Sequence, residues 1–170
     1  MFENIVVATD GSSSAKRAVE TAAKLAASCG AKLIIVHAVL PYVLLKEVES
    51  SPKFNDLPQE ARDEIKQIHD TISRLELRAW EPAPRSATDF IGNAVLDEAE
   101  GIAQANGSAD ISRVLVYGNA AENVVEVARK SGADLIVIGT RGLSDFKGLM
   151  LGSVSHKVMQ LGECSCLIVK

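Results

Sequence analysis

The stretch 134–155, DLIVIGTRGLSDFKGLMLGSVS, decides the fold of this chain. It begins with the apolar run Leu135–Ile138, and such a run without polar alternation predicts a strand buried on both faces, as in a parallel sheet. The run ends at Gly139, and a loop that contains Gly142 follows. A helix is expected to begin at Gly152-Ser153, with Ser153 as its N-cap. The stretch therefore predicts a strand, a glycine-rich loop and a helix.

This arrangement points backbone N–H groups toward phosphates, because the loop and the helix start both present unpaired donors. Glycine lets a ligand approach the backbone closely. The hydroxyls of Ser153 and Ser155 add donors, and Arg141 and Lys147 add positive charge. A plain connector between a strand and a helix has the same local pattern, so both interpretations stay open at this point.

The rest of the chain alternates strands with helices. Strands are predicted at 4–9, 32–39, 111–117, 134–138 and 166–169. Helices are predicted at 14–28, 59–79, 86–105, 121–131 and 153–161, with Ser86 as the N-cap of the third. The opening 4–39 forms a βαβ unit, which requires a parallel pair and a right-handed crossover. The order of elements predicts a three-layer α/β/α sandwich around a five-stranded parallel sheet.

Composition limits the classes of protein to consider. A length of 170 residues predicts one domain, and 47% hydrophobic with 4% aromatic residues predicts a core of Val, Ile, Leu and Ala. A net charge of −4 without a Lys/Arg block argues against nucleic-acid binding. Three cysteines give no disulfide framework, and no apolar run approaches the ~18 residues of a membrane span. These features predict a cytoplasmic protein without a membrane partner.

Two motifs resemble the ATP-binding branch of the universal stress protein family. One is the spacing Gly-x2-Gly-x9-Gly-Ser that starts at Gly139, and the other is VVATDGSSS at 6–14. The similarity continues through LGSVSHKV at 151–158 and leaves only about 40–85 unmatched. The resemblance implies a single domain over 1–170, with an inserted loop and helix at about 40–85.

The resemblance also implies the strand order 3-2-1-4-5 of a Rossmann-like fold, similar to the adenine nucleotide alpha hydrolases. In such a sheet a ligand binds beyond the carboxyl ends of strands 1 and 4, where the order reverses. The family places ATP there, with Mg or Mn held through the phosphates and water. The residues that this likeness assigns to the nucleotide are Ala8, Thr9, Asp10, Ala38, Val39, Gly139, Arg141, Gly142, Gly152, Ser153, Val154 and Ser155.

No catalytic residue and no protein-held metal site is assigned. Asp10 is interpreted as a turn residue that also contacts the nucleotide, His37 as a core histidine and His156 as a solvated one. The pair Cys164 and Cys166 lacks the second pair of ligands that a zinc site needs.

Three functions are weighed. The favoured hypothesis is a regulatory ATP-binding protein of the stress response, with slow or no hydrolysis. The second is an enzyme of the same fold that hydrolyses ATP or adenylylates a substrate, and the third is a partner-binding module with an unoccupied cleft.

A homodimer is predicted through the last strand, 166–169. In the implied order this strand lies at an edge, and its unpaired N–H and C=O groups require a partner. The resemblance supplies one, since the family pairs this strand with its copy across a two-fold axis.

Overall fold

The computed structural model describes residues 1–39, 48–75, 83–142 and 151–170. Its elements are β1 (Asn4–Ala8), α1 (Ser13–Cys29), β2 (Lys32–Val39), the short 3-10 helix η1 (Phe54–Asp56), α3 (Gln59–Leu75), α4 (Arg85–Ala105), β3 (Ile111–Tyr117), α5 (Ala120–Ser131), β4 (Leu135–Gly139), α6 (Ser153–Leu161) and β5 (Ser165–Val169). The five strands form one parallel sheet in the order β3-β2-β1-β4-β5. The predicted fold class and strand order are confirmed.

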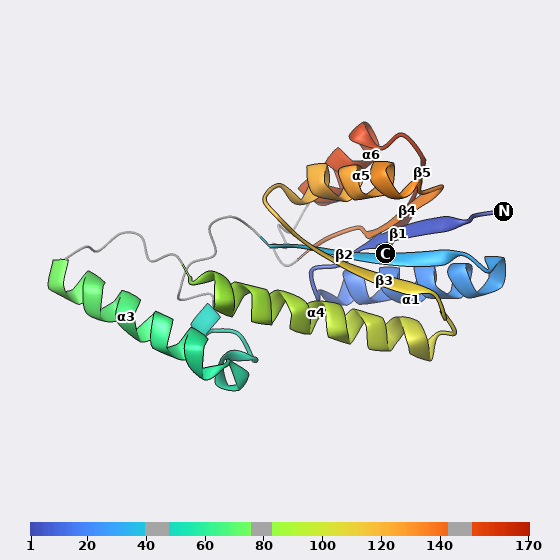
Figure 1. Cartoon of the computed structure of the whole chain (residues 1–170). Helices are drawn as coiled ribbons and strands as arrows, with labels where there is room; N and C mark the ends of the chain where they lie inside the picture. The colour runs from blue at the N-terminus through green and yellow to red at the C-terminus, as the bar shows by residue number, and fades with distance from the viewer. Residues whose placement is uncertain (40–47, 76–82, 143–150) are drawn as a thin grey trace.

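Helices cover both faces of the sheet (Figure 1). Alternate residues of β1 divide between two apolar clusters: Ile5 and Val7 pack with α1 and α4, whereas Val6 packs with α5 and Val158 of α6. Because side chains of a strand alternate between its faces, both sets must be apolar. This is why the strands appear in the sequence as unbroken apolar runs.

Small residues let the helices lie close to the sheet. The side of α1 that faces the sheet is mostly alanine, and α1 ends at Gly30, which has φ +67° and donates its N–H to the Ala26 carbonyl. Gly92 of α4 likewise lets this helix lie close to β2 and β3. A Cβ there would lie 2.8 Å from Leu115 Cδ1 and 3.1 Å from Val39 Cγ2.

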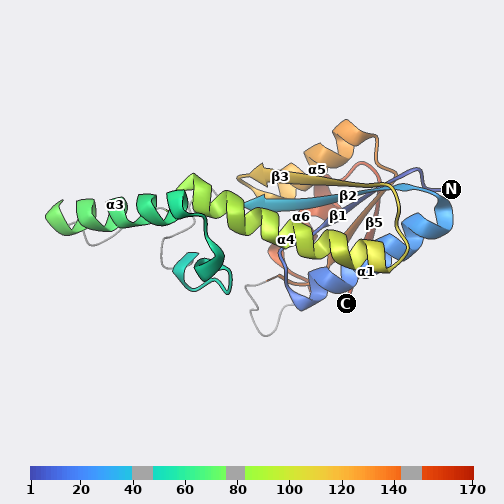
Figure 2. The same ribbon diagram turned by 60° about the horizontal axis from the view of Figure 1, so that its bottom comes forward.

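The helix α3 belongs to a separate apolar cluster. Its Ala61 and Ile65 pack with Val48, Leu57 and Ala87, near the start of α4. Figures 1 and 2 show α3 extending past the N-terminal end of α4, away from the sheet. The helix was predicted at 59–79, and residues 76–79 lie outside the described residues, as do 40–47 and 80–82 of the predicted insertion.

The prediction of Ser86 as an N-cap is wrong. The N-cap of α4 is Pro84, which fits this position because its φ of −63° and ψ of 148° lead into the helix. The Ser86 hydroxyl instead donates to Glu64 Oε2 at 2.6 Å, and so joins α4 to α3. The hydroxyl therefore donates to a tertiary partner instead of accepting a backbone N–H of its own helix.

Among the helices of the described ranges, none combines the length and the apolar character that crossing a membrane requires.

Candidate functional site

The carboxyl ends of β1 and β4 lie side by side where the strand order reverses. Val7 pairs with Val137, and the chain leaves the two strands through Thr9-Asp10 and Thr140-Arg141. Thr9 is buried, donates its N–H to Val36 O at 2.9 Å and has its own carbonyl 2.8 Å from His37 Nδ1. The half-buried His37 therefore has a polar partner, as predicted.

Asp10 is held in the turn between β1 and α1. Its Oδ1 accepts the Ser12 N–H at 3.0 Å, and Thr9 Oγ1 accepts the N–H of Gly11 at 3.2 Å. Gly11 has φ +79°, which favours glycine. Ser12 then caps α1, with its hydroxyl 3.3 Å from the Ala15 N–H. The other carboxylate oxygen of Asp10 faces the loop after β4, since a Cβ on Gly142 would lie 2.5 Å from Oδ2.

The described ends of the loop after β4 are tied together. Gly152 donates its N–H to the Thr140 carbonyl at 2.7 Å, and the buried Ser155 hydroxyl lies 3.2 Å from the same oxygen and 2.9 Å from Gly152 O. A Cβ on Gly152 would lie 3.3 Å from Thr140 O. The closure at Gly152 and Thr140 places the start of α6 beside the end of β4. Residues 143–150, with Lys147, lie outside the described residues.

The start of α6 is open. Gly152 is its N-cap, and no side chain of the described residues caps it, so the prediction of Ser153 as the N-cap is wrong. Ser153 is instead the first residue of the helix, and it is exposed. Val154 is 38% exposed. The first N–H groups of α6 thus lie at the surface beside Thr140 and Gly152, where the helix dipole favours an anion.

The structure brings most of the predicted site residues to one edge of the sheet. Contacts join Asp10 with Gly142, and Thr140 with Gly152 and Ser155. Ala38 and Val39 lie at the end of β2, one strand farther from β4, where Val39 O accepts the Gly118 N–H at 2.9 Å. His156 is exposed on α6, as predicted.

Sequence reasoning missed Ser14. Its side chain is buried, and its hydroxyl donates to the carbonyl oxygen of Arg141. Ser14 lies in a run of three serines, and nothing in that run distinguishes it from its neighbours. Only the contact between α1 and the loop after β4 identifies it.

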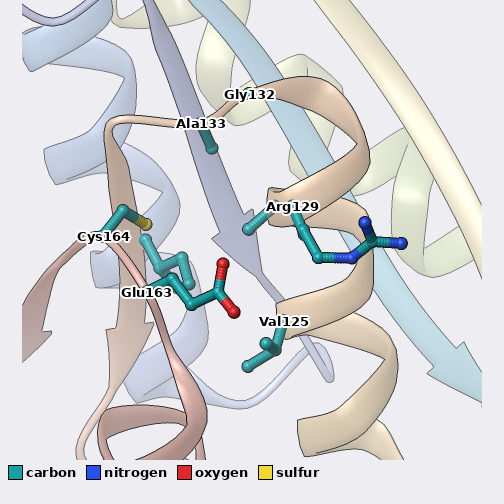
Figure 3. Close-up of a pocket in the computed structure, with 8 residues that line it drawn as sticks. Val125, Arg129, Gly132, Ala133, Glu163 and Cys164 are labelled. Atoms are coloured by element: carbon teal, nitrogen blue, oxygen red, sulfur yellow. The ribbon is translucent and has the colours of Figure 1, made fainter.

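A pocket lies at the opposite, amino end of β4 (Figure 3). Its lining residues are Val125, Ala128, Arg129, Gly132, Ala133, Ile136, Glu163 and Cys164. Burial raises the pKa of the Cys164 thiol, which makes the thiol less reactive. In the described part of the chain, no three His, Cys, Asp or Glu side chains gather as ligands for a metal ion.

Comparisons with known proteins agree on one family. The model of the universal stress protein family matches residues 1–170. The chain is 32% identical to the universal stress protein YxiE of Bacillus subtilis over 170 residues, which cover all of both chains. A solved universal stress protein in complex with cAMP is 30% identical, with a TM-score of 0.63 over 99% of this chain and 97% of that one. The universal stress protein of Archaeoglobus fulgidus in complex with dAMP, at 21% identity and a TM-score of 0.61 over 99% and 98% of the two chains, shares the fold.

Proposed function

The chain belongs to the universal stress protein family, and on this premise we propose that it is a regulatory protein of the stress response that binds ATP at the carboxyl ends of β1 and β4. The observation that carries the proposal is the closed loop base at Thr140 and Gly152, which places the start of α6 beside the end of β4. No side chain of the described residues caps this helix start, and Asp10 lies against Gly142 of the same loop. These are the donors and the close backbone approach that phosphates use. The relative solved with cAMP, at 30% identity, supports an adenine nucleotide as the ligand.

Each part of the nucleotide has a place in this proposal. Ala8, Thr9 and Asp10 line the base and ribose side, with Ala38 and Val39 beside the adenine. The residues Gly139, Arg141, Gly142, Gly152, Ser153, Val154 and Ser155 hold ribose and phosphates. Mg²⁺ or Mn²⁺ accompanies the triphosphate and is bound mainly by phosphate oxygens and water. The exposed Arg141 supplies positive charge beside the phosphates.

We propose that hydrolysis is slow or absent. Asp10 places its carboxylate against the loop, and one of its oxygens is already an acceptor for the Ser12 N–H. The other oxygen lies against Gly142, where a Cβ would come within 2.5 Å of it. An accelerated hydrolase needs a group that is placed to orient or deprotonate water as well as charge stabilisation. A carboxylate engaged in a turn in this way favours binding over turnover.

The proposal also includes a homodimer through β5. Within the described residues β5 pairs with β4 alone, and its central side chains are half-buried. A second copy of β5, antiparallel across a two-fold axis, would satisfy the free edge. Light scattering that shows a monomer at micromolar concentration would reject the dimer. A dimer that persists in a folded Ile168→Pro variant would reject β5 as its interface.

Calorimetry tests the central proposal. We expect the wild type to bind ATP with Mg²⁺, and Gly142→Val to lose about 100-fold in affinity because its side chain occupies the space beside Asp10. Gly101→Val is the matched control, since a Cβ at that exposed helical glycine meets nothing within 4 Å. Absence of ATP binding in the wild type, or equal affinity in Gly142→Val, would overturn the proposal. Phosphate release by the same samples at on the order of 10 per second would favour the enzyme instead.

A further inference from the structure

Ser14 joins the first turn of α1 to the loop after β4. It is 6% exposed, and its hydroxyl donates to the carbonyl oxygen of Arg141. The approach depends on Gly139, because a Cβ there would lie 2.6 Å from Ser14 Oγ and 2.9 Å from the Ser14 carbonyl carbon. A backbone atom cannot move aside as a flexible side chain can. The missing side chain of Gly139 therefore has a packing role, which lets Ser14 reach Arg141.

This hydrogen bond determines how one peptide group of the loop is oriented. A peptide bond is planar and trans, so the Arg141 carbonyl and the Gly142 N–H point in opposite directions. When Ser14 holds the carbonyl toward α1, the Gly142 N–H is held away from α1. Gly142 itself would leave this peptide free to rotate, since glycine tolerates many backbone conformations. The bond from Ser14 removes that freedom.

We propose that Ser14 is a positioning residue for the phosphates of the bound nucleotide. It holds the Arg141 carbonyl toward α1, and so keeps the Gly142 N–H directed away from α1 and available to a phosphate oxygen before the ligand arrives. A donor that is already oriented loses less conformational entropy when it binds. This inference rests on the proposed function, and it assigns to that site a residue that need not touch the ligand.

The test compares Ser14→Ala with Ser13→Ala, the same substitution at the neighbouring exposed serine. Nuclear magnetic resonance on the ligand-free proteins should show the Gly142 amide shifted in Ser14→Ala and unchanged in Ser13→Ala. Titrations with ATP and with adenosine, which has no phosphate, should then separate positioning from general damage. In Ser14→Ala we expect ATP affinity to fall about five- to tenfold, the effect of one hydrogen bond, and adenosine affinity to stay within about twofold.

The outcomes are distinct. A wild type that binds neither ligand overturns the proposed function and, with it, the role of Ser14. A wild type that binds ATP, together with a Ser14→Ala variant of equal affinity or an unmoved Gly142 amide, overturns the role of Ser14 alone. Equal losses for ATP and adenosine assign Ser14 a structural role and also overturn the inference. If Ser14→Ala fails to fold, Ser14→Cys repeats the test, because a thiol is a weak donor.

Discussion

The two ends of β4 both carry glycines and charged side chains, yet they differ in what happens to the backbone donors. At the amino end the chain satisfies its own groups. The carboxylate of Asp134 accepts the N–H of Glu3 at 2.7 Å and of Asn4 at 2.9 Å, and Arg129 is bound to Glu126 at 2.8 and 3.0 Å. At the carboxyl end, no side chain from the described part of the chain caps the start of α6.

This difference between the two ends shows that a pocket does not by itself mark a binding site. The pocket at the amino end is lined by apolar residues together with the charged Arg129 and Glu163, and Figure 3 shows the Arg129 guanidinium directed away from Glu163. The carboxyl end instead combines crowded glycines with the exposed start of a helix. Phosphate recognition needs available donors more than it needs volume. The proposed function follows this criterion and places the ligand at the carboxyl end.

Glycine-to-alanine substitutions at the two ends give the largest expected contrast. Gly139→Ala should destabilise the fold by about 3 kcal/mol, because its Cβ would meet the backbone of Ser14 at 2.9 Å inside a buried contact. Gly132→Ala meets nothing within 4 Å and carries only the cost of φ +60°, about 1 kcal/mol. Urea unfolding of both variants measures the difference. Equal losses in the free energy of unfolding would show that the carboxyl end of β4 is no more tightly packed than its amino end.

Arginine substitutions give an intermediate contrast. Arg141→Ala should lower ATP affinity about tenfold, since it removes a charged donor at the proposed phosphate side. Arg129→Ala should leave ATP affinity unchanged because Arg129 lies at the amino end of β4, away from the proposed phosphate side. Calorimetry with ATP and adenosine checks both. The account of the two ends would be wrong if Arg129→Ala weakened ATP binding as much as Arg141→Ala.

The acid dependence of stability gives the smallest contrast. Hydrogen bonds from the Asn4 and Glu3 N–H groups hold the pKa of Asp134 below its ordinary value. The unfolded state therefore takes up this proton first as the pH falls. The stabilisation is present above the ordinary pKa of an aspartate and is lost as the pH falls through the depressed one.

Asp134→Asn should accordingly flatten the fall in stability between about pH 5 and pH 3, measured by urea unfolding at a series of pH values. If the free energy of unfolding of Asp134→Asn falls with pH as steeply as that of the wild type, this carboxylate does not hold β1 to β4 in solution.

The sequence predicted the parts of this structure that depend on local pattern. The buried run at Leu135–Ile138 is apolar because both faces of the sheet are covered, and Gly30 ends α1 as a residue with positive φ. The strand order came from the resemblance, since five similar apolar runs carry no order of their own. The structure confirms this order, in which β1 lies beside β4, and the order brings Asp10 and Gly142 together.

Tertiary contacts account for what the sequence could not predict. Ser14 and Ser13 are chemically identical in the sequence, and only the approach of α1 to Gly139 gives one of them the Arg141 carbonyl. Ser153 looked like a cap because serine favours that position, but the N-cap is one residue earlier, at Gly152, and Ser153 is the first residue of the helix. Ser86 likewise donates to Glu64, a partner 22 residues away.

Amide chemical shifts during a titration with ATP and Mg²⁺ test the central claim most directly, because they report on both ends of β4 in one sample. The account predicts that the amides of Asp10, Gly142, Ser153 and Val154 move and approach saturation together, while those of Gly132, Ala133 and Cys164 stay in place. Shifts confined to the amino end, or none at all at saturating ATP, would contradict it.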